Sequence, residues 1–264
     1  MKRLLLLFAS LLLLVSSALA AVKDQSVADK VLTAASKNRI DVGLSYHGDL
    51  VHFFGVNPVP NSDLIIRLTA AKSEELKLSV KGRFGPFWMT VKQYEVTGIP
   101  FVFKIHANKP ITQIISPAVM EELELGYPAL KKKMQMHLIR GTAAPEDAEL
   151  VFQGVIKIKE RSNLYNIVED PERLKITDGR LFQHYFRFPP AATEGIYLVE
   201  SFSFVNGELV GYGKDQVEIR KVGLAHWLTY TSQNYAVAYG IMAVLIAIGA
   251  GLFVGIIFKK GGHH

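Results

Sequence analysis

The side chains in this sequence that could perform chemistry begin with a group of histidines and carboxylates near residue 50. His47, Asp49 and His52 lie close together, and imidazole and carboxylate groups are common metal ligands. A metal site also needs side chains that converge on one point, with further ligands from elsewhere in the chain. A polar turn explains His47 and Asp49 equally well, and His52 fits on the face of a strand. These residues are the candidate metal ligands, but we expect neither a metal nor another cofactor.

A catalytic arrangement is suggested only by His184, which follows Asp178 in a strand-like segment. Serines are frequent, but none lies in a G-x-S-x-G sequence, which forms the sharp turn that exposes a nucleophile. We therefore predict that the protein is not an enzyme. The acidic group Glu121, Glu122 and Glu124 and the run Lys131–Lys133 indicate solvated helix faces, although the lysines could alternatively contact anionic lipid headgroups.

Composition excludes two further classes of function. The chain has no cysteine, which excludes disulfides and thiol redox chemistry. Its formal net charge is +6, but two of the lysines and arginines lie at residues 2–3 and two more at 259–260, which leaves +2 for the rest. Nucleic-acid binding requires a concentrated basic face, so we expect no nucleic-acid partner.

The first 20 residues have the three parts of an export signal. Lys2 and Arg3 supply positive charge, residues 4–15 are almost entirely apolar, and Ala18-Leu19-Ala20 places small residues at a cleavage site. The apolar run is short for a bilayer core of about 30 Å. We predict a signal peptide at 1–20 and Ala21 as the first mature residue, with an uncleaved anchor as the alternative.

The other end of the chain contains 24 uncharged residues, Tyr235–Phe258. At about 1.5 Å per residue, a helix of this length spans about 36 Å, which is enough to cross a membrane. Lys259 and Lys260 follow directly, and positive residues at this position remain in the cytoplasm. We predict a transmembrane helix at 235–258 and a cytoplasmic tail at 259–264.

Aromatic residues precede the span. Trp227 and Tyr230 lie in the segment 223–234, and with Tyr235 they suit the lipid headgroup layer. We predict a short interfacial helix over 223–234, with an aromatic loop as the alternative.

The span itself carries a regular series of small residues. Ala243, Ala247, Gly251 and Gly255 recur every four residues, which places them on one helix face. Small residues at this spacing let two helices approach closely in lipid, and they predict a membrane-protein partner or a homo-oligomer. The alternative is ordinary use of glycine and alanine in a membrane helix.

Between the two ends the pattern is mainly β. Residues 21–115 form one β-rich segment, in which Ile40–Tyr46 and Leu50–Val56 predict a hairpin. Residues 166–222 form a second, in which Asn206-Gly207 predicts a hairpin because both residues tolerate φ > 0. We predict an immunoglobulin-like or related β-sandwich, and one or two domains remain open.

Residues 116–165 are predicted to be a helical insert. Ser116 can cap a helix that starts at Pro117. A second helix is expected from Tyr127 to Arg140. Pro145-Glu146-Asp147 opens a third, with Val151, Phe152 and Val155 on its apolar face, although a strand over 155–159 is the alternative.

Several short sequences occur in the order of a known family. They are Lys81-x-Arg83 leading to Trp88, Gly98-Ile99-Pro100 with Lys109-Pro110, Asn163-Leu164-Tyr165, Phe188-Pro189 through Gly195-x-Tyr197, and Arg220-Lys221-Val222-Gly223. With these, the chain resembles the family of alphaproteobacterial putative transmembrane proteins over essentially its whole mature length. It departs at Pro86 and Phe103, where the family pattern has glycine and tyrosine.

The resemblance carries no established activity. It implies a bacterial inner-membrane protein with its bulk in the periplasm. Family members are often encoded beside permeases that resemble sulfite exporters, which implies an accessory role in export or in handling sulfur oxyanions.

Two functions are therefore expected. The first is a non-catalytic accessory or scaffold partner of a membrane transporter, which predicts an exposed apolar or aromatic patch near the membrane. The second is an exported ligand- or metal-binding receptor or enzyme, which predicts a concave pocket lined by titratable residues. The mutual positions of His47, His52, His106 and His184 distinguish the two.

Overall fold

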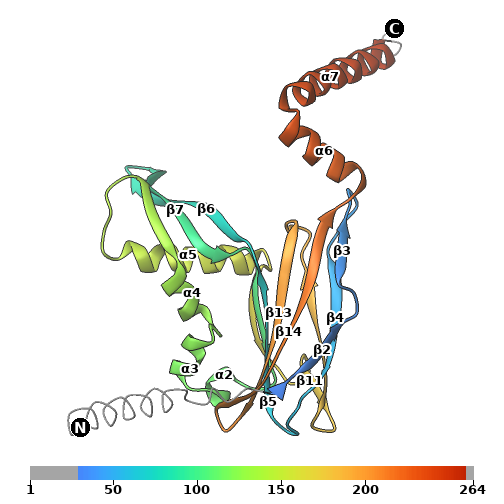
Figure 1. Ribbon diagram of the computed structural model, residues 1–264. Coiled ribbons are helices and arrows are strands. Elements are labelled where there is room, and N and C mark those ends of the chain that lie inside the picture. Colours follow the sequence, from blue (N-terminus) through green and yellow to red (C-terminus); the bar gives the residue numbers. More distant parts are fainter. Residues whose placement is uncertain (1–28, 260–264) are drawn as a thin grey trace, which may run out of the picture.

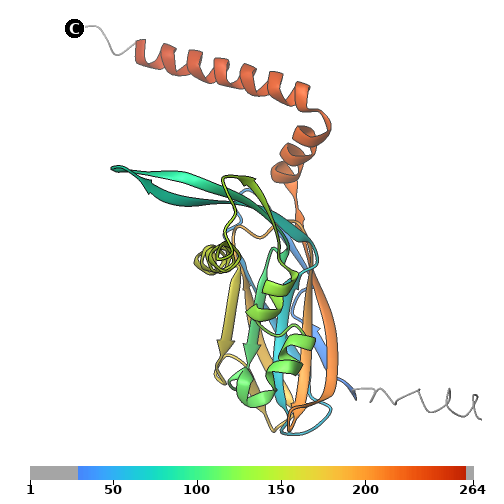
Figure 2. The ribbon, with the colours of Figure 1, turned by 90° about the vertical axis from the view of Figure 1, so that its left-hand side faces the viewer.

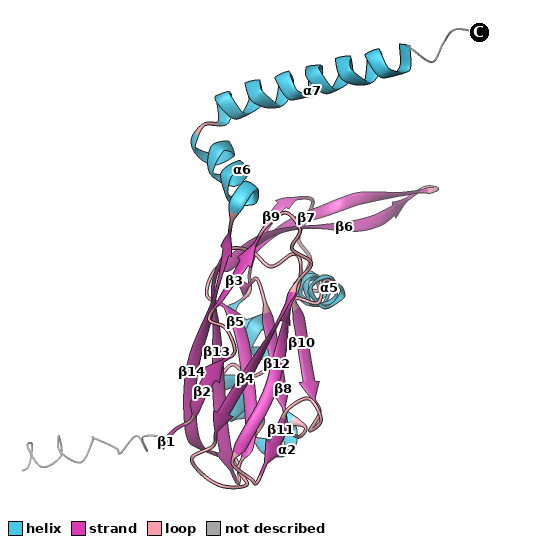
Figure 3. Ribbon diagram, turned by 90° about the vertical axis from the view of Figure 1, so that its right-hand side faces the viewer, coloured by secondary structure: helices cyan, strands magenta, loops and turns pink. Residues whose placement is uncertain are grey.

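A β-sandwich forms the body of the protein, and a long C-terminal helix leaves it (Figure 1). The computed structural model describes residues 29–259, so the expected signal peptide at 1–20 and the tail beyond Lys259 lie outside the described residues. Two sheets pack face to face and enclose the main core (Figure 3). This confirms the predicted fold class, which is mainly β with a helical insert and one C-terminal apolar helix.

The larger sheet has the strand order β1-β14-β13-β5-β8-β10, and β3 also pairs with β14. Its strands are β1 (Asp29–Lys30), β3 (Arg39–Val42), β5 (Asp63–Ala70), β8 (Phe103–Ala107), β10 (Tyr165–Glu169), β13 (Gly195–Val205) and β14 (Glu208–Lys221). The β13–β14 hairpin turns at Asn206-Gly207, where φ is 52° and 86°. This hairpin is the one that the sequence predicts.

The smaller sheet has the order β11-β12-β4-β2, with every neighbouring pair antiparallel. Its strands are β2 (Leu32–Ala35), β4 (Asp49–Val56), β11 (Lys175–Thr177) and β12 (Leu181–Phe188). Strand β4 pairs with β12, and in the larger sheet β5 pairs with β13. The two β-rich segments of the sequence therefore contribute to both sheets together.

The hairpin predicted around residues 47–49 is wrong. Strand β3 pairs in parallel with β14 in the larger sheet, whereas β4 pairs with β2 and β12 in the smaller one. Ile40 of β3 and Phe53 of β4 are both buried in the main core. Residues 43–48 therefore cross from one sheet to the other, because a strand in either sheet satisfies the same alternation of apolar and polar residues.

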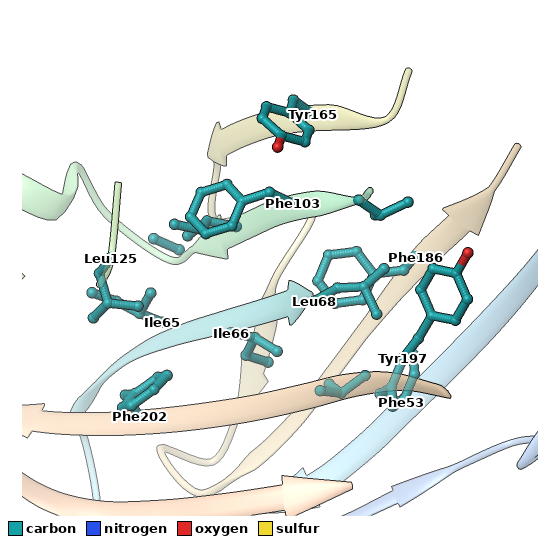
Figure 4. Packing of buried hydrophobic residues seen from close by; sticks show 14 of the residues in the cluster. Phe53, Ile65, Ile66, Leu68, Phe103, Leu125, Tyr165, Phe186, Tyr197 and Phe202 are labelled. Atoms are coloured by element: carbon teal, nitrogen blue, oxygen red, sulfur yellow. The ribbon is translucent and has the colours of Figure 1, made fainter. Parts of the chain in front are cut away.

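The core lies between the sheets. Figure 4 shows Leu68, Phe53, Phe186 and Tyr197 clustered there. Phe53 and Phe186 meet edge to face, with ring centroids 6.0 Å apart, which is a favourable arrangement for aromatic rings.

Short helices cover the outer face of the larger sheet (Figure 2). They are α2 (Ile111–Ile114), α3 (Pro117–Glu122) and α4 (Tyr127–Lys133). Leu125 and Leu130, beside and within these helices, belong to the main core. Strand β8 is consequently buried along its whole length, because both of its faces are covered.

The helix predicted from Tyr127 to Arg140 is too long. Helix α4 ends at Lys133, and β9 (Gln135–Arg140) follows as a strand. Strand β9 pairs with a free edge of β7 (Phe87–Pro100), so sheet pairing overrides the helical expectation. At the start of α3, the Ser116 hydroxyl accepts a hydrogen bond from the Val119 backbone N–H, as the sequence predicts.

Strand β6 (Ser73–Phe84) and β7 form a long hairpin that we call the arm. With β9 they make a separate three-stranded sheet that projects from the body (Figure 1). Helix α5 (Asp147–Arg161) packs on the base of the arm, where Val151 and Val155 form a second small core with Tyr94, Val96 and Ile99. The helical interpretation of 147–161 is thus confirmed over the strand alternative.

Two helices follow β14. They are α6 (Gly223–Asn234) and α7 (Ala236–Lys259), separated by Tyr235. In the described part of the chain, one helical stretch, Ala236–Ile256, is long and apolar enough to cross a membrane, and none of it is buried within the protein.

Candidate functional site

The three candidate metal ligands do not converge. The Asp49 carboxylate lies 2.7 Å from the Lys37 ammonium, and His47 Nδ1 lies 2.5 Å from the Ser45 carbonyl oxygen. The His52 ring stacks on Phe54, with centroids 6.4 Å apart. Between residues 29 and 259 there is no group of three or more histidine, cysteine or acidic side chains that could hold a metal ion.

Two other histidines meet in the core. His106 on β8 and His184 on β12 have ring centroids 6.1 Å apart and are 7% and 1% exposed. His106 Nδ1 and both ring nitrogens of His184 lack a hydrogen-bond partner in the described residues. In the described residues Asp178 therefore makes no hydrogen bond to His184.

Burial keeps both imidazoles neutral. Burial lowers the pKa of His106 to about 4, and the positive charges of Lys104 and Arg173 add to the effect. Burial, with the neighbouring His106 and His52, also lowers the pKa of His184 well below its usual value.

A cleft beside His106 is rich in positive charge. Its cavity of about 280 Å³ is lined by polar side chains that include Lys104, Arg173, Arg187 and one acid, Asp170. Lys104 Nζ donates a hydrogen bond of 2.8 Å to the Arg187 carbonyl oxygen. Burial, together with Arg187, lowers the pKa of Lys104 to about 8. Within the described range, no carboxylate lies within 4.0 Å of the basic nitrogens of these three cationic residues.

A second cavity adjoins the first. It has a volume of about 510 Å³, and its lining includes His47, Asp49 and Arg161. Asn163 and Arg187 line both cavities, so the two form neighbouring parts of one polar region. None of the lysines and arginines of this region is predicted from the sequence, because they come from four separate segments with no shared motif.

The aromatic residues predicted for the membrane interface gather around α6. Trp227, Tyr230 and Tyr235 are 46%, 49% and 58% exposed. The Tyr230 ring lies 6.2 Å from that of His226 on one side and 6.2 Å from that of Tyr235 on the other. The segment 223–234 is helical as predicted, and its aromatic side chains are available to lipid. Lys259 ends α7, and Lys260 lies outside the described residues.

The small residues of α7 are uncovered. Ala243 and Ala247 are exposed, and a side chain added at Gly251 or Gly255 would meet nothing within 4 Å in the described chain. Neither the body nor α6 occupies this helix face.

The tip of the arm is a feature that was not predicted from the sequence. Phe87, Trp88 and Met89 are 68%, 70% and 53% exposed. They follow a two-residue turn at Gly85-Pro86, in which Gly85 has φ 60°. That Gly-Pro pair between two alternating segments was the available signal for a hairpin.

Comparison with known proteins places this architecture in a family. The sequence profile described as "Putative transmembrane protein (Alph_Pro_TM)" matches residues 30–260. The chain belongs to this family. No curated protein and no solved structure matches the chain.

The Alph_Pro_TM match covers both sheets, the arm, α6 and α7. Together with the apolar helix α7, it identifies the protein as a membrane protein with one candidate C-terminal span.

Proposed function

We propose that this Alph_Pro_TM member is a non-catalytic accessory or scaffold partner of a membrane transporter. Helix α7 holds it in the inner membrane, the body lies in the periplasm, and the tail lies in the cytoplasm. The observation that carries the proposal is α7 itself, which no part of the described body covers. A helix that served only to bury apolar surface would pack against the sandwich.

The small face of α7 supports a helix partner. Small residues line one side of the helix, at Ala243, Ala247, Gly251 and Gly255, and dispersion contacts between close backbones stabilise helix pairs in lipid. The partner is a transporter helix, and a second copy of this chain is the other occupant that the test must detect.

The outer face of the smaller sheet gives a second contact surface. Leu32, Val56 and Leu181 lie opposite one another on three adjacent strands and are 58%, 38% and 52% exposed. A row of apolar side chains on a sheet face is a common feature of protein contact surfaces.

The proposal is tested by replacing both Gly251 and Gly255 with Leu in the full chain. The added side chains prevent close approach of a second helix, while the hydrophobic length of the span is preserved. We expect crosslinking in native membranes to recover about tenfold less partner or dimer than the unmodified protein.

Gly249 provides the matched control. At about 100° per residue it lies about 200° around the helix from Gly251, and it is also open to its surroundings. The Gly249→Leu variant should retain the partner. Equal recovery from the double variant and the unmodified protein would show that α7 is a plain anchor.

The cationic cleft supports a second candidate function, an anion receptor. Three basic side chains line one cavity without a carboxylate partner, which favours a small oxyanion such as sulfite, sulfate or phosphate.

Calorimetric titration of the detergent-solubilised protein with each anion tests this function. Arg187→Gln should weaken binding about tenfold, because one charge-assisted contact is lost. Lys175→Gln, on exposed β11, should leave it unchanged. No heat of binding with any of the three anions would exclude the receptor.

A further inference from the structure

The outer half of the arm lies beyond the reach of helix α5. The second small core that joins α5 to the arm includes Tyr94, Val96 and Ile99 near its base. Farther out, Phe87, Trp88, Met89 and Val91 remain between 43% and 70% exposed. These exposed apolar side chains at the tip are not covered by anything in the described chain, and such residues on a surface mark an interaction site.

The two faces of the arm tip carry different side chains. Trp88 lies directly opposite Arg83, and Met89 lies opposite Gly82, so Trp88 and Arg83 share one face. Phe87 and Met89 alternate with Trp88 and lie on the other face. A tryptophan beside an arginine suits the boundary between headgroups and acyl chains, where the indole and the long arginine side chain each present an apolar part and a polar end.

All the charged residues at the tip of the arm are positive. Between Val80 and Lys92 the chain contains Lys81, Arg83 and Lys92 and no acidic residue. The Lys92 ammonium is paired with Asp147 at the base, at 2.8 Å. Lys81 and Arg83 remain to meet an anionic surface, and basic residues around an apolar tip are attracted by anionic lipids.

The arm lies at the end of the body from which the chain continues into α6 and α7. Figures 1, 2 and 3 all show the arm and α6 at this end. The opposite end, where β11 lies, is far from both (Figure 1). If α7 crosses a bilayer, α6 lies at the surface that faces the body, and the arm projects from that same end of the body (Figure 1).

We propose that the tip of the arm, residues 81–91, inserts into the outer leaflet of the membrane that α7 spans. The occupant of this surface is lipid with anionic headgroups, and the body is held at two separated points. The inference rests on the proposed function only in that α7 must lie in the membrane.

The two tryptophans of the chain allow the arm and the anchor to be tested separately. Trp227→Phe leaves Trp88 as the sole reporter of the tip, and Trp88→Phe leaves Trp227 as the reporter of α6. Each full-length variant is reconstituted in vesicles of phosphatidylethanolamine and phosphatidylglycerol, with or without bromine on the acyl chains. Brominated chains quench only a tryptophan that enters the bilayer.

We expect brominated lipid to reduce Trp88 emission about twofold, because an interfacial tip lies at the headgroup and acyl boundary. The matched control is Lys175→Trp in a chain without the other tryptophans. Lys175 is exposed on β11, at the end of the body opposite the arm (Figure 1), so its replacement should be quenched by aqueous acrylamide and not by lipid.

Three outcomes show whether the tip of the arm enters the bilayer. Lipid quenching of both Trp88 and Trp227 supports the proposal. Quenching of Trp227 alone overturns the insertion of the arm while leaving the anchor intact. Trp88 that is protected from acrylamide yet unquenched by lipid also overturns it, because the tip is then buried against protein. If Lys81 and Arg83 are both replaced by Gln, the quenching of Trp88 should weaken and lose its dependence on phosphatidylglycerol.

Discussion

Two buried histidines set the response of the body to acid. His106 and His184 sit among aromatic side chains in the sandwich core, 4.5 Å and 4.9 Å from the Phe186 ring by centroid distance. The groups that face them are His52, Lys104 and Arg173, none of which favours a second positive charge. Protonation of either ring therefore places an unpaired charge in a low-dielectric site.

The stability of the protein should fall as the pH drops below 6.5. A histidine whose pKa is lowered on folding contributes its full stability above the unfolded value of about 6.5, and this is lost as the pH falls toward the folded value. For His106, with a folded pKa of about 4, the loss of free energy of unfolding reaches about 3 kcal/mol by pH 4. Urea denaturation at a series of pH values, followed by circular dichroism, measures it.

A His184→Phe variant distinguishes the histidines from the carboxylates. His184 stacks on Phe53 with ring centroids 5.1 Å apart, so phenylalanine fits the same aromatic environment. The variant should retain its fold and show a shallower loss of stability between pH 6.5 and 4. An identical pH profile in the variant and the unmodified protein would contradict this assignment.

Among the elements, helix α5 is joined to the arm by one buried carboxylate in addition to the second small core. Asp147 is 2% exposed, forms an ion pair with Lys92 at 2.8 Å, and accepts a hydrogen bond from the Tyr94 hydroxyl. It also accepts one of 2.7 Å from the Ala144 backbone N–H. The hydrogen bonds from Lys92 and Tyr94 lower the pKa of Asp147 to about 2, so the contact is intact at neutral pH.

Asp147→Ala should release the arm without unfolding the sandwich. Removal of the carboxylate leaves the buried Tyr94 hydroxyl without its hydrogen-bond partner. It also breaks the ion pair that joins the start of α5 to Lys92 of the arm. We expect backbone amides of β7 and β9 to exchange with deuterium about tenfold faster, while those of β13 and β14 keep their rates.

The control for this change lies two residues away on the same helix. Glu149 pairs with Lys131 at 2.5 Å, but both side chains are about half exposed, at 54% and 48%. Glu149→Ala should leave the exchange of the arm unchanged, because exposed ion pairs contribute little to stability. Uniform acceleration throughout the sandwich in Asp147→Ala would mean that α5 supports the whole fold rather than the arm alone.

Some of the secondary-structure elements were predictable from the sequence, and the pairing of distant strands was not. Alternation, helix caps and the Asn206-Gly207 turn depend on neighbouring residues, so the β-sandwich and the start of α3 were predictable. Pairing between distant strands was not. Residues 39–42 and 49–56 alternate as a hairpin would, yet they join different sheets, because Ile40 and Phe53 reach one core from opposite sides.

The candidate sites likewise divide into those formed within one helix, which the sequence predicts, and those formed by distant segments, which it does not. The interfacial aromatic residues and the small face of α7 lie within single helices, and their spacing could be counted in the sequence. Lys104, Arg173 and Arg187 line one cavity because the fold brings β8 of one sheet close to β12 of the other, which no local pattern reveals. His47, Asp49 and His52 illustrate the converse, since closeness in sequence did not bring their side chains to one point.

On the scale of the whole molecule, the span and the arm lie at one end and the cationic cleft lies within the body. A single span that joins α6 at the helix break of Tyr235 would attach the body to the membrane at one point. Insertion of the arm would add a second point of attachment and fix which face of the sandwich is turned to a neighbouring membrane protein. The apolar row Leu32, Val56 and Leu181 would then be presented at a constant orientation.

The orientation of the chain across the membrane can be read with single cysteines, since the natural sequence has none. Leu44 lies on the connection between the two sheets and is 67% exposed, so Leu44→Cys places a reactive thiol on the body. Gly262→Cys places one in the tail, two residues after Lys260.

If Lys259 and Lys260 remain in the cytoplasm, a membrane-impermeant maleimide added to spheroplasts should label the first variant and not the second. Detergent should then expose the tail thiol, which shows that it is reactive. Labelling of Gly262→Cys in intact spheroplasts, with Leu44→Cys protected, would place the sandwich in the cytoplasm and remove the physical basis for a periplasmic accessory protein.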